Sequence, residues 1–112
     1  MKLDMLVPQP VNYETFKRNR ERFVPEKSGC YVLTTFANEV LYVGLAKNLR
    51  SRMNNHLDSD AKTAPTALGR ATYFYWLEGL EIEKIERTWM NIHIQQEGVL
   101  PPLNTVYSPV ST

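Results

Sequence analysis

Four side chains in the first half of the sequence have the types and spacing needed for proton transfer beside a bound anion. Two tyrosines, eleven positions apart, belong to the triplets Gly29–Tyr31 and Tyr42–Gly44. Arg52 and His56 follow four residues apart, and on a helix that spacing points both side chains the same way. The guanidinium group of an arginine binds oxyanions through a rigid, planar set of N–H donors, and a histidine exchanges protons near neutral pH. A tyrosine has a reference pKa of about 10, so it accepts a proton only with help from neighbours.

A β-hairpin and a helix are expected to position these residues. Residues 30–36 are rich in strand-forming side chains, residues 37–39 form a short turn, and residues 40–43 form the second strand. Gly29 and Gly44 allow close backbone approach or unusual φ values at the open end of this hairpin. The helix is predicted over residues 47–57, where Arg52 and His56 lie beside a buried stripe. That stripe consists of Leu49, Met53 and Leu57.

The rest of the chain supplies one more strand and two more helices. A short helix over Tyr13–Phe23, capped by Asn12, precedes the hairpin, and residues 58–69 are expected to form a linker. A third strand is predicted over residues 70–77, and its aromatic residues on both faces suggest cover on both sides. The longest helix is expected over residues 80–96, before a terminating Gly98. Its apolar stripe is Ile82, Ile85, Trp89 and Ile92, and Glu86 flanks that stripe.

Composition narrows the class of protein. The 112 residues, 43% of them hydrophobic, are enough for one domain with a modest core. No apolar run approaches the roughly 18 residues of a membrane span, and no signal peptide is evident at the N-terminus. The single Cys30 excludes an intrachain disulfide and a cysteine-based zinc site. These features predict a cytoplasmic protein with no membrane partner.

Charge is distributed unevenly along the chain. Residues 1–56 carry nine Lys/Arg and five Asp/Glu, whereas residues 57–112 carry four and seven. The basic half contains the two tyrosine triplets, and such a half can contact a polyanion or can simply be a solvated surface. Both alternatives stay open for the basic segment around Arg18 and Arg22. Together with Lys47 and Arg50, these arginines are the candidate phosphate contacts.

The motifs resemble those of the GIY-YIG nuclease family. They are GCY, ten intervening residues, YVG, then AKNLRSRMNNH, a helical IERTW, and PPLN. The resemblance covers about residues 28–104. It implies an α+β fold with a small central antiparallel three-stranded sheet flanked by helices. The predicted organisation is an N-terminal extension over residues 1–28, the nuclease domain over 29–104 and a tail over 105–112.

The resemblance also assigns roles to residues. Tyr31 and Tyr42 match the two family tyrosines, and Arg52 stands at the position of the catalytic arginine. His56 occupies a position where the family often has His or Tyr, and Glu86 matches the metal-binding glutamate. Asn104 matches an asparagine near the end of the domain and is a further candidate nucleic-acid contact. Glu81, Glu83 and Glu97 are alternative carboxylates, because 18 positions between Glu86 and Asn104 exceed the expected spacing.

This resemblance implies a metal-dependent endonuclease that hydrolyses DNA phosphodiester bonds with one Mg²⁺ or Mn²⁺ ion. Tyr31 is favoured as the general base with Tyr42 orienting the water or phosphate, but His56 is an alternative base or phosphate ligand. Duplex, branched and single-stranded DNA all stay open as substrates, and so does RNA. Any sequence specificity is expected to come from the N-terminal basic segment, the loop over residues 58–69, a dimer or a protein partner. The alternative function is a catalytically weak nucleic-acid-binding or protein-interaction module that retains the fold.

Overall fold

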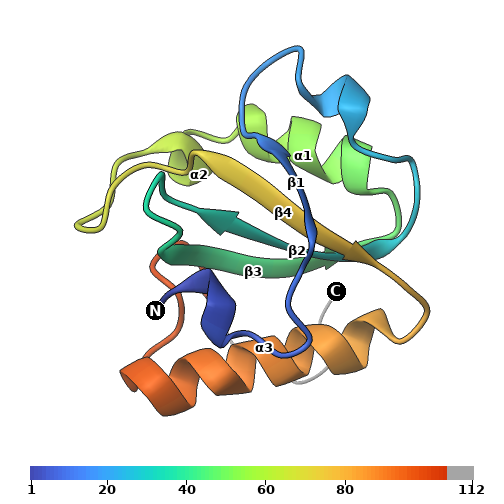
Figure 1. The fold of residues 1–112 in the computed structure, drawn as a ribbon. Coiled ribbons are helices and arrows are strands. Elements are labelled where there is room, and N and C mark those ends of the chain that lie inside the picture. Colours follow the sequence, from blue (N-terminus) through green and yellow to red (C-terminus); the bar gives the residue numbers. More distant parts are fainter. Residues whose placement is uncertain (106–112) are drawn as a thin grey trace.

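The computed structural model describes residues 1–105 and shows one antiparallel sheet with helices on both faces. The strands are β1 (Asn12–Thr15), β2 (Gly29–Thr34), β3 (Val40–Ala46) and β4 (Tyr73–Glu78), in the spatial order β1-β4-β2-β3 (Figure 1). The helices are α1 (Leu49–Leu57), α2 (Asp60–Thr63) and α3 (Ile82–Glu97), and two 3-10 turns lie at Leu3–Met5 and Glu21–Phe23. The α+β class is therefore confirmed, with four strands instead of the predicted three.

The predicted hairpin is present: β2 lies inside the sheet between β4 and β3, and β3 forms one edge. Its register pairs Tyr31 with Gly44 and Leu33 with Tyr42. Asn38 takes the left-handed conformation in the turn (φ 63°), which asparagine tolerates better than most residues. Because side chains alternate across a strand, residues 31 and 33 face one side of the sheet and residues 30 and 32 face the other.

Each face of the sheet has its own helix and its own hydrophobic cluster. Tyr31, Leu33 and Phe74 pack with Leu49 and Met53 of α1. The opposite cluster joins the other face of the hairpin to α3. Its members include Cys30, Val32, Val43, Ile82, Trp89 and Met90. The alternation of strand side chains thus decides which residues reach α1 and which reach α3.

The predicted helix over Tyr13–Phe23 is wrong. Residues Asn12–Thr15 form β1 instead, and they pair antiparallel with β4. Tyr13 stacks on Tyr75 with ring centroids 5.1 Å apart, and cross-strand aromatic pairs of this kind stabilise sheets. The edge strand also satisfies backbone groups of β4 that would otherwise lack ladder partners. Long-range pairing therefore outweighed a weak local helix signal.

Two other expectations need smaller corrections. The predicted linker over residues 58–69 contains α2, which Ser59 caps by accepting a hydrogen bond from the Lys62 backbone N–H at 3.3 Å. The third strand begins at Tyr73, and only one of its faces is fully covered: Phe74 and Trp76 are buried, whereas Tyr73 and Tyr75 are half-buried. Gly98 ends α3 in the left-handed conformation as expected (φ 76°). Of the predicted tail, only Thr105 belongs to the described residues.

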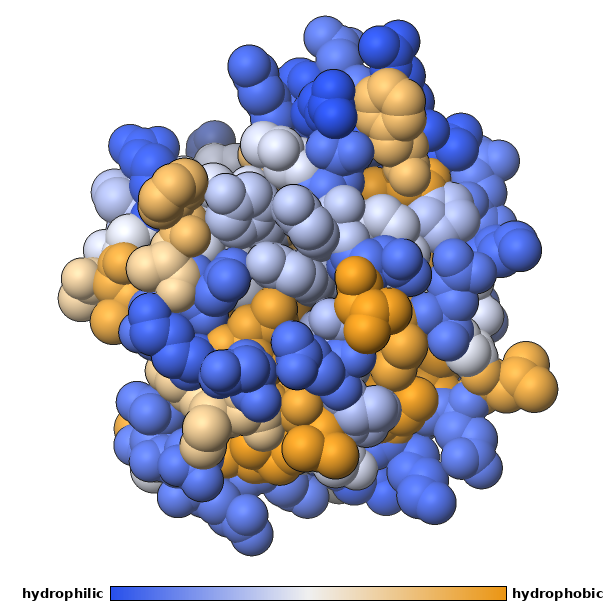
Figure 2. All heavy atoms as spheres, viewed as in Figure 1, coloured by the Kyte–Doolittle hydropathy of each residue, from blue (hydrophilic) through white to orange (hydrophobic). Residues whose placement is uncertain are grey.

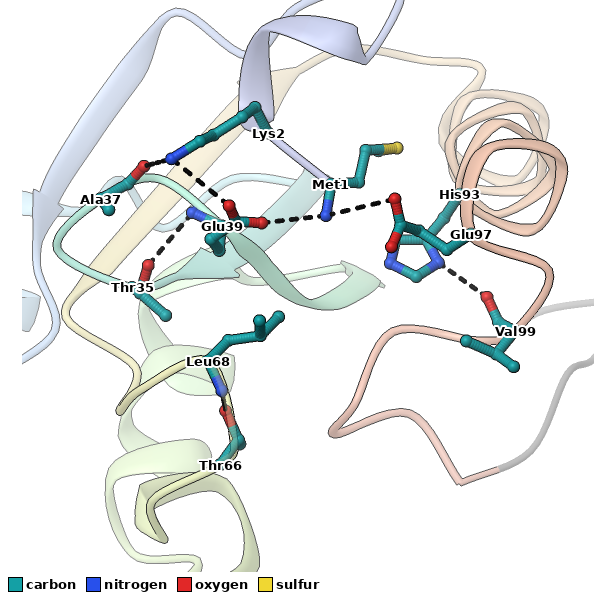
Figure 3. A network of polar contacts seen from close by, with 10 residues as sticks. All are labelled: Met1, Lys2, Thr35, Ala37, Glu39, Thr66, Leu68, His93, Glu97 and Val99. Carbon is teal, nitrogen blue, oxygen red and sulfur yellow. Dashed lines mark hydrogen bonds and ion pairs between the residues drawn. The ribbon is translucent and has the colours of Figure 1, made fainter.

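The first residues pack against the hairpin and the end of α3 (Figure 3). The Met1 ammonium is almost fully buried and lies 3.0 Å from the Glu39 carboxylate and 3.7 Å from that of Glu97. His93 Nδ1 lies 2.7 Å from the Val99 carbonyl oxygen in the same region. These contacts hold the hairpin turn and the C-terminal end of α3 together.

Hydrophobic and hydrophilic side chains are distributed unevenly over the surface. Figure 2 shows hydrophobic surface over the N-terminal segment and α3, whereas the segment that follows β1 is covered by hydrophilic side chains. Among the described residues, no helix is long and apolar enough to cross a membrane.

Candidate active site

The Tyr31 hydroxyl and the His56 imidazole form the centre of the candidate site. Tyr31 Oη lies 2.5 Å from His56 Nε2, and this contact joins β2 to α1. Both side chains are buried, with exposed fractions of 0% and 8%. Burial is the main reason that the pKa of Tyr31 is well above its usual value, and it also lowers the pKa of His56 to about 4. At neutral pH the phenol is therefore protonated and the imidazole is neutral, so Tyr31 donates and His56 accepts.

Helical spacing explains why His56 reaches the tyrosine. Asn48 caps α1 by accepting a hydrogen bond from the Ser51 backbone N–H at 3.0 Å, which fixes where the helix begins. Leu49 and Met53 are fully buried, so the helix cannot rotate away from the sheet. His56 is one turn beyond Met53 and consequently faces the hairpin. This part of the predicted site is brought together as expected.

Tyr42 and Gly44 complete the tyrosine pair. The rings of Tyr31 and Tyr42 stack with centroids 5.8 Å apart, and the Tyr42 ring lies 5.0 Å from the His56 ring. A Cβ atom at Gly44 would lie 2.6 Å from the Tyr31 hydroxyl oxygen. Only glycine leaves room for the phenol at this position. Gly44 thus serves close approach, one of the two roles predicted for it, and its φ is not positive.

Arg52 lies where α1, β3 and α3 meet. Its Nη1 donates to the Leu45 carbonyl oxygen at 3.2 Å, which fixes the guanidinium at the end of β3. Arg52 also lowers the pKa of both Tyr31 and Glu86 from the values that burial alone would give. The cation therefore lies within electrostatic reach of the phenol on one side and the carboxylate on the other.

Glu86 lies within the buried face of α3 and does not merely flank it. The predicted stripe placed Ile85 and Ile92 inward, but both are only half-buried, whereas Glu86 is 6% exposed. Burial raises the pKa of Glu86 to about 7, and the neighbouring Glu83 adds to the rise. No ion pair among the described residues includes Glu86. A buried carboxylate without an ion-pair partner is a suitable ligand for a cation.

A cleft of about 530 Å³ opens beside Arg52. Most of its lining comes from the start of α1 and the residues before it, and Ile82 and Glu83 close it from α3. Its polar lining residues on the α1 side are Lys47, Asn48, Ser51, Arg52 and Asn55. The cleft therefore combines cationic and amide donors with a carboxylate, a set that suits a phosphate group.

The donor set fits a sparsely ligated hard cation better than a protein cage. Within residues 1–105, no group of three or more His, Cys, Asp or Glu side chains could hold a metal. Mg²⁺ usually keeps several waters and takes only one or two carboxylates. Glu86 supplies the buried carboxylate for such an arrangement, and Glu83 supplies a second one at the cleft. Glu97, another predicted alternative, is instead 3.7 Å from the Met1 ammonium, at the far end of α3.

Asn104 is fully engaged with the edge of the sheet. Its Oδ1 accepts from the Val43 backbone N–H and its Nδ2 donates to the Val43 carbonyl oxygen, both at 3.0 Å. The amide thus pairs with β3 as a further strand would. These two bonds to Val43 fix the middle residue of the second triplet, between Tyr42 and Gly44. Contact between Asn104 and nucleic acid stays a prediction.

The four predicted basic contacts have different environments. Lys47 is exposed and lines the cleft beside Arg52. Arg50 donates from Nε to the Val24 carbonyl oxygen at 2.8 Å and from Nη2 to that of Arg22 at 3.2 Å, so it anchors the preceding loop. The Arg18 guanidinium pairs with the Asp58 carboxylate, and the Arg22 guanidinium lies 5.1 Å from the Phe23 ring centroid. Lys47 is therefore the member of this set that lies at the candidate site.

One residue at the site was missed from the sequence. Lys62 of α2 places its Nζ 4.9 Å from the centroid of the Tyr42 ring, and its charge contributes to the low pKa of His56. The only available sequence signal was Ser59 three residues before Lys62, a spacing that fits a helix cap inside the presumed linker.

Comparisons with known proteins agree with this geometry. The sequence profile of the GIY-YIG catalytic domain matches residues 27–97. The chain is 34% identical over 64 residues to the UvrABC system protein C of Rickettsia bellii, a match that covers 55% of this chain and 10% of that protein. It is 53% identical over 36 residues to the protein of the same name from Borrelia duttonii, covering 32% of this chain and 6% of that protein.

The matched part is thus a tenth or less of the length of these relatives. The profile match, by contrast, spans well over half of this chain and includes both tyrosine triplets, α1 and all of α3. The chain belongs to the GIY-YIG catalytic domain family.

Proposed function

We propose that this protein is a metal-dependent endonuclease that hydrolyses phosphodiester bonds in DNA. The observation that carries the proposal is the buried Tyr31–His56 hydrogen bond, with its Oη–Nε2 distance of 2.5 Å, next to Arg52. A proton acceptor in contact with the phenol and a fixed cation next to it are what attack of water on a phosphate requires. Family membership supports the same reaction class.

The proton path begins at Tyr31. Its raised pKa makes a standing phenolate unfavourable, so the phenol must release its proton as it receives one. Tyr31 Oη takes a proton from the attacking water while its own proton passes to His56 Nε2, which is neutral and already in hydrogen-bond contact. The products of the transfer are a bound hydroxide, a neutral Tyr31 and an imidazolium. This path gives the tyrosine and the histidine complementary roles.

Arg52 would stabilise the charge that develops on the phosphoryl group. Its guanidinium is held by the Leu45 carbonyl oxygen and lines the cleft, so it is oriented before the substrate arrives. An oriented cation favours the transition state because no reorganisation is needed during the reaction. Tyr42, stacked on Tyr31, would hold the water or phosphate over the phenol.

Glu86 would hold the divalent ion, with Glu83 as the alternative or additional ligand. When bound, Mg²⁺ or Mn²⁺ polarises the phosphate and stabilises the leaving oxygen. The chain itself contributes a buried carboxylate whose pKa of about 7 shows how poorly its environment solvates the charge. A cation at this position would restore the ionised form of Glu86.

A plasmid-nicking assay tests the proposal. Purified protein and supercoiled DNA are incubated with Mg²⁺ or Mn²⁺ and, in parallel, with EDTA. We expect nicking only with metal, loss of nicking in Glu86→Gln, and a loss of about 100- to 1,000-fold in Arg52→Ala. Glu97→Gln is the matched control, because this carboxylate is on the same helix but pairs with the Met1 ammonium.

Equal nicking by wild type, Glu86→Gln and Arg52→Ala would contradict the assignment of these residues. Salt-sensitive DNA binding without cleavage under any metal condition would instead support the alternative function, a nucleic-acid-binding module. Parallel reactions with single-stranded DNA, branched DNA and RNA identify the preferred substrate form.

A further inference from the structure

Lys62 is a half-buried cation with an unusual set of neighbours. Its ammonium lies 4.9 Å from the centroid of the Tyr42 ring, so it faces an aromatic surface that is part of the candidate site. None of the ion pairs found in residues 1–105 includes Lys62. A lysine that has lost part of its hydration without gaining a carboxylate retains most of its capacity to bind an anion.

The backbone around Lys62 is held in place by several hydrogen bonds. The Ser59 hydroxyl accepts from the Lys62 backbone N–H at 3.3 Å, and the Thr63 hydroxyl donates to the Ser59 carbonyl oxygen at 2.9 Å. Arg70 Nη1 donates to the Thr63 carbonyl oxygen at 3.3 Å, which joins α2 to the segment that precedes β4. The lysine is therefore presented from an ordered turn directly after α1.

The groups facing His56 come from four elements. Tyr31 of β2 and Tyr42 of β3 contact the imidazole ring, and the charges of Arg52 on α1 and Lys62 on α2 also act on it. Two cations thus converge on a pair of phenols and a neutral imidazole. An anion placed between these cations would complete the charge balance of the site.

We propose that Lys62 is a substrate-binding residue that contacts a backbone phosphate of the nucleic-acid strand beside the phosphate held by Arg52. This assignment rests on the proposed nuclease function and adds to it a second cationic subsite, on the other side of Tyr42 from the hairpin core. The strand passes over the half-buried face of Tyr42, with Lys62 and Arg52 on successive phosphates. The segment over residues 58–69 is then part of the active site.

This subsite also makes the pKa of His56, the proton acceptor, depend on whether the nucleic-acid strand is bound. In the free protein, Lys62 and Arg52 both lower the pKa of His56, after the larger effect of burial. Phosphates bound to the two cations neutralise these charges, so the imidazole becomes a stronger base only when the strand is present. Unproductive protonation of His56 in the free protein is thereby avoided.

Binding in EDTA tests the subsite without requiring cleavage. The affinity of wild type, Lys62→Met and Lys62→Arg for a fluorescent DNA oligonucleotide is measured by anisotropy over a series of salt concentrations. Methionine keeps an unbranched apolar side chain and removes the charge. We expect Lys62→Met to bind about fivefold more weakly or worse, with a salt slope smaller by about 0.7–0.9, and Lys62→Arg to resemble wild type.

Lys2→Gln is the matched control, because it also removes one positive charge but its ammonium already pairs with Glu39 at 3.3 Å. We expect its salt slope to equal that of wild type. If Lys62→Met has the wild-type slope and affinity, the subsite assignment is overturned, whereas nicking by the wild type would leave the nuclease proposal intact. If the wild type itself shows no salt-dependent binding, both proposals fail.

A second readout follows the His56 imidazole by NMR. In wild type, oligonucleotide should move its pKa upward from about 4, and in Lys62→Met the pKa should already be higher before any addition. A Lys62 that only packs on Tyr42 would leave the salt slope unchanged and would leave the response of His56 to oligonucleotide unchanged. That result would also overturn the proposal.

Discussion

Replacing Gly44 with alanine should displace the Tyr31 phenol and leave the rest of the fold nearly unchanged. The added methyl group would lie 2.6 Å from the Tyr31 hydroxyl oxygen and 2.8 Å from Cε1 of Tyr42. Tyr31 cannot turn away freely, because it is fully buried and stacks on Phe74 with ring centroids 4.9 Å apart and planes 11° apart. The substitution therefore acts on the one atom that the proposed proton path depends on most.

The magnitude follows from the contact distances. Ordinary van der Waals contact begins near 3.4 Å, so the Tyr31 hydroxyl must retreat by about 0.8 Å from its present 2.6 Å. Overpacking of a core costs about 1–3 kcal/mol of unfolding free energy. A misplacement near 1 Å at reacting groups costs about 100-fold in rate. We therefore expect Gly44→Ala to lose about 1–3 kcal/mol of unfolding free energy and about 100-fold in nicking rate.

Two measurements separate the effect on stability from the effect on the site. Urea unfolding gives the loss of free energy, and nicking per folded molecule gives the loss of rate. Gly79→Ala is the neutral control, because a Cβ there meets no heavy atom within 4 Å. Gly29→Ala is the packing control, because its Cβ would lie 2.6 Å from the Leu77 carbonyl oxygen and not against a phenol.

The reasoning about Gly44 would be refuted by a variant that nicks at the wild-type rate and keeps His56 titrating near its wild-type pKa of about 4. Such a result would show that the pocket absorbs the methyl group without moving Tyr31. Equal rate losses in Gly44→Ala and Gly29→Ala would also count against it. In that case general overpacking would explain the lost activity.

Three further predictions concern α1 and the sheet edge. The His56 side chain should contribute a loss of about 3 kcal/mol as pH falls from 6.5 to 4, because the unfolded chain protonates its histidine before the folded chain does. Glu86, with a raised pKa of about 7, contributes a gain over the same window in wild type and in His56→Gln alike, so the difference between their unfolding free energies in urea tests the prediction. Asn104→Asp should cost about 1–3 kcal/mol in chemical denaturation, because a carboxylate cannot donate to the Val43 carbonyl oxygen, and Asn104→Ala should cost at least as much. Arg50→Ala should lower the melting temperature with little change in nicking per folded molecule. Arg52→Ala should lower nicking per folded molecule with little change in melting temperature.

The hairpin, α1 and α3 were predictable from the sequence because their signals are local. The cluster of strand formers and the apolar spacing of α1 each act within one strand or one turn. The strand β1 was not predictable in this way. Its partner Tyr73–Trp76 lies about sixty residues away, and only that pairing makes an extended Tyr13 favourable over a helical one.

Residues of the candidate site also differ in whether local periodicity or long-range packing determines their positions. Tyr31, Tyr42, Arg52 and His56 converge because the strand and helix periods place them together, and their predicted roles still await the assays above. The inward rotation of Glu86 could not be read from apolar residues alone. A carboxylate on the buried face looks like an interruption of the stripe, and its position is tolerable only beside Arg52 or a bound cation.

Lys62 is a residue of the candidate site that lies outside the sequence motifs of the family. The segment that carries it has no apolar period, so sequence patterns describe it as a connection between two elements. Its geometry is set by a three-residue cap and by hydrogen bonds to Arg70, which only the folded chain brings together. In the proposed site the tyrosine triplets and α1 supply the proton path and Arg52, and this segment adds a cation beside the Tyr42 ring. The salt slope of the Lys62 variants therefore measures a property that the tyrosine motifs alone do not determine.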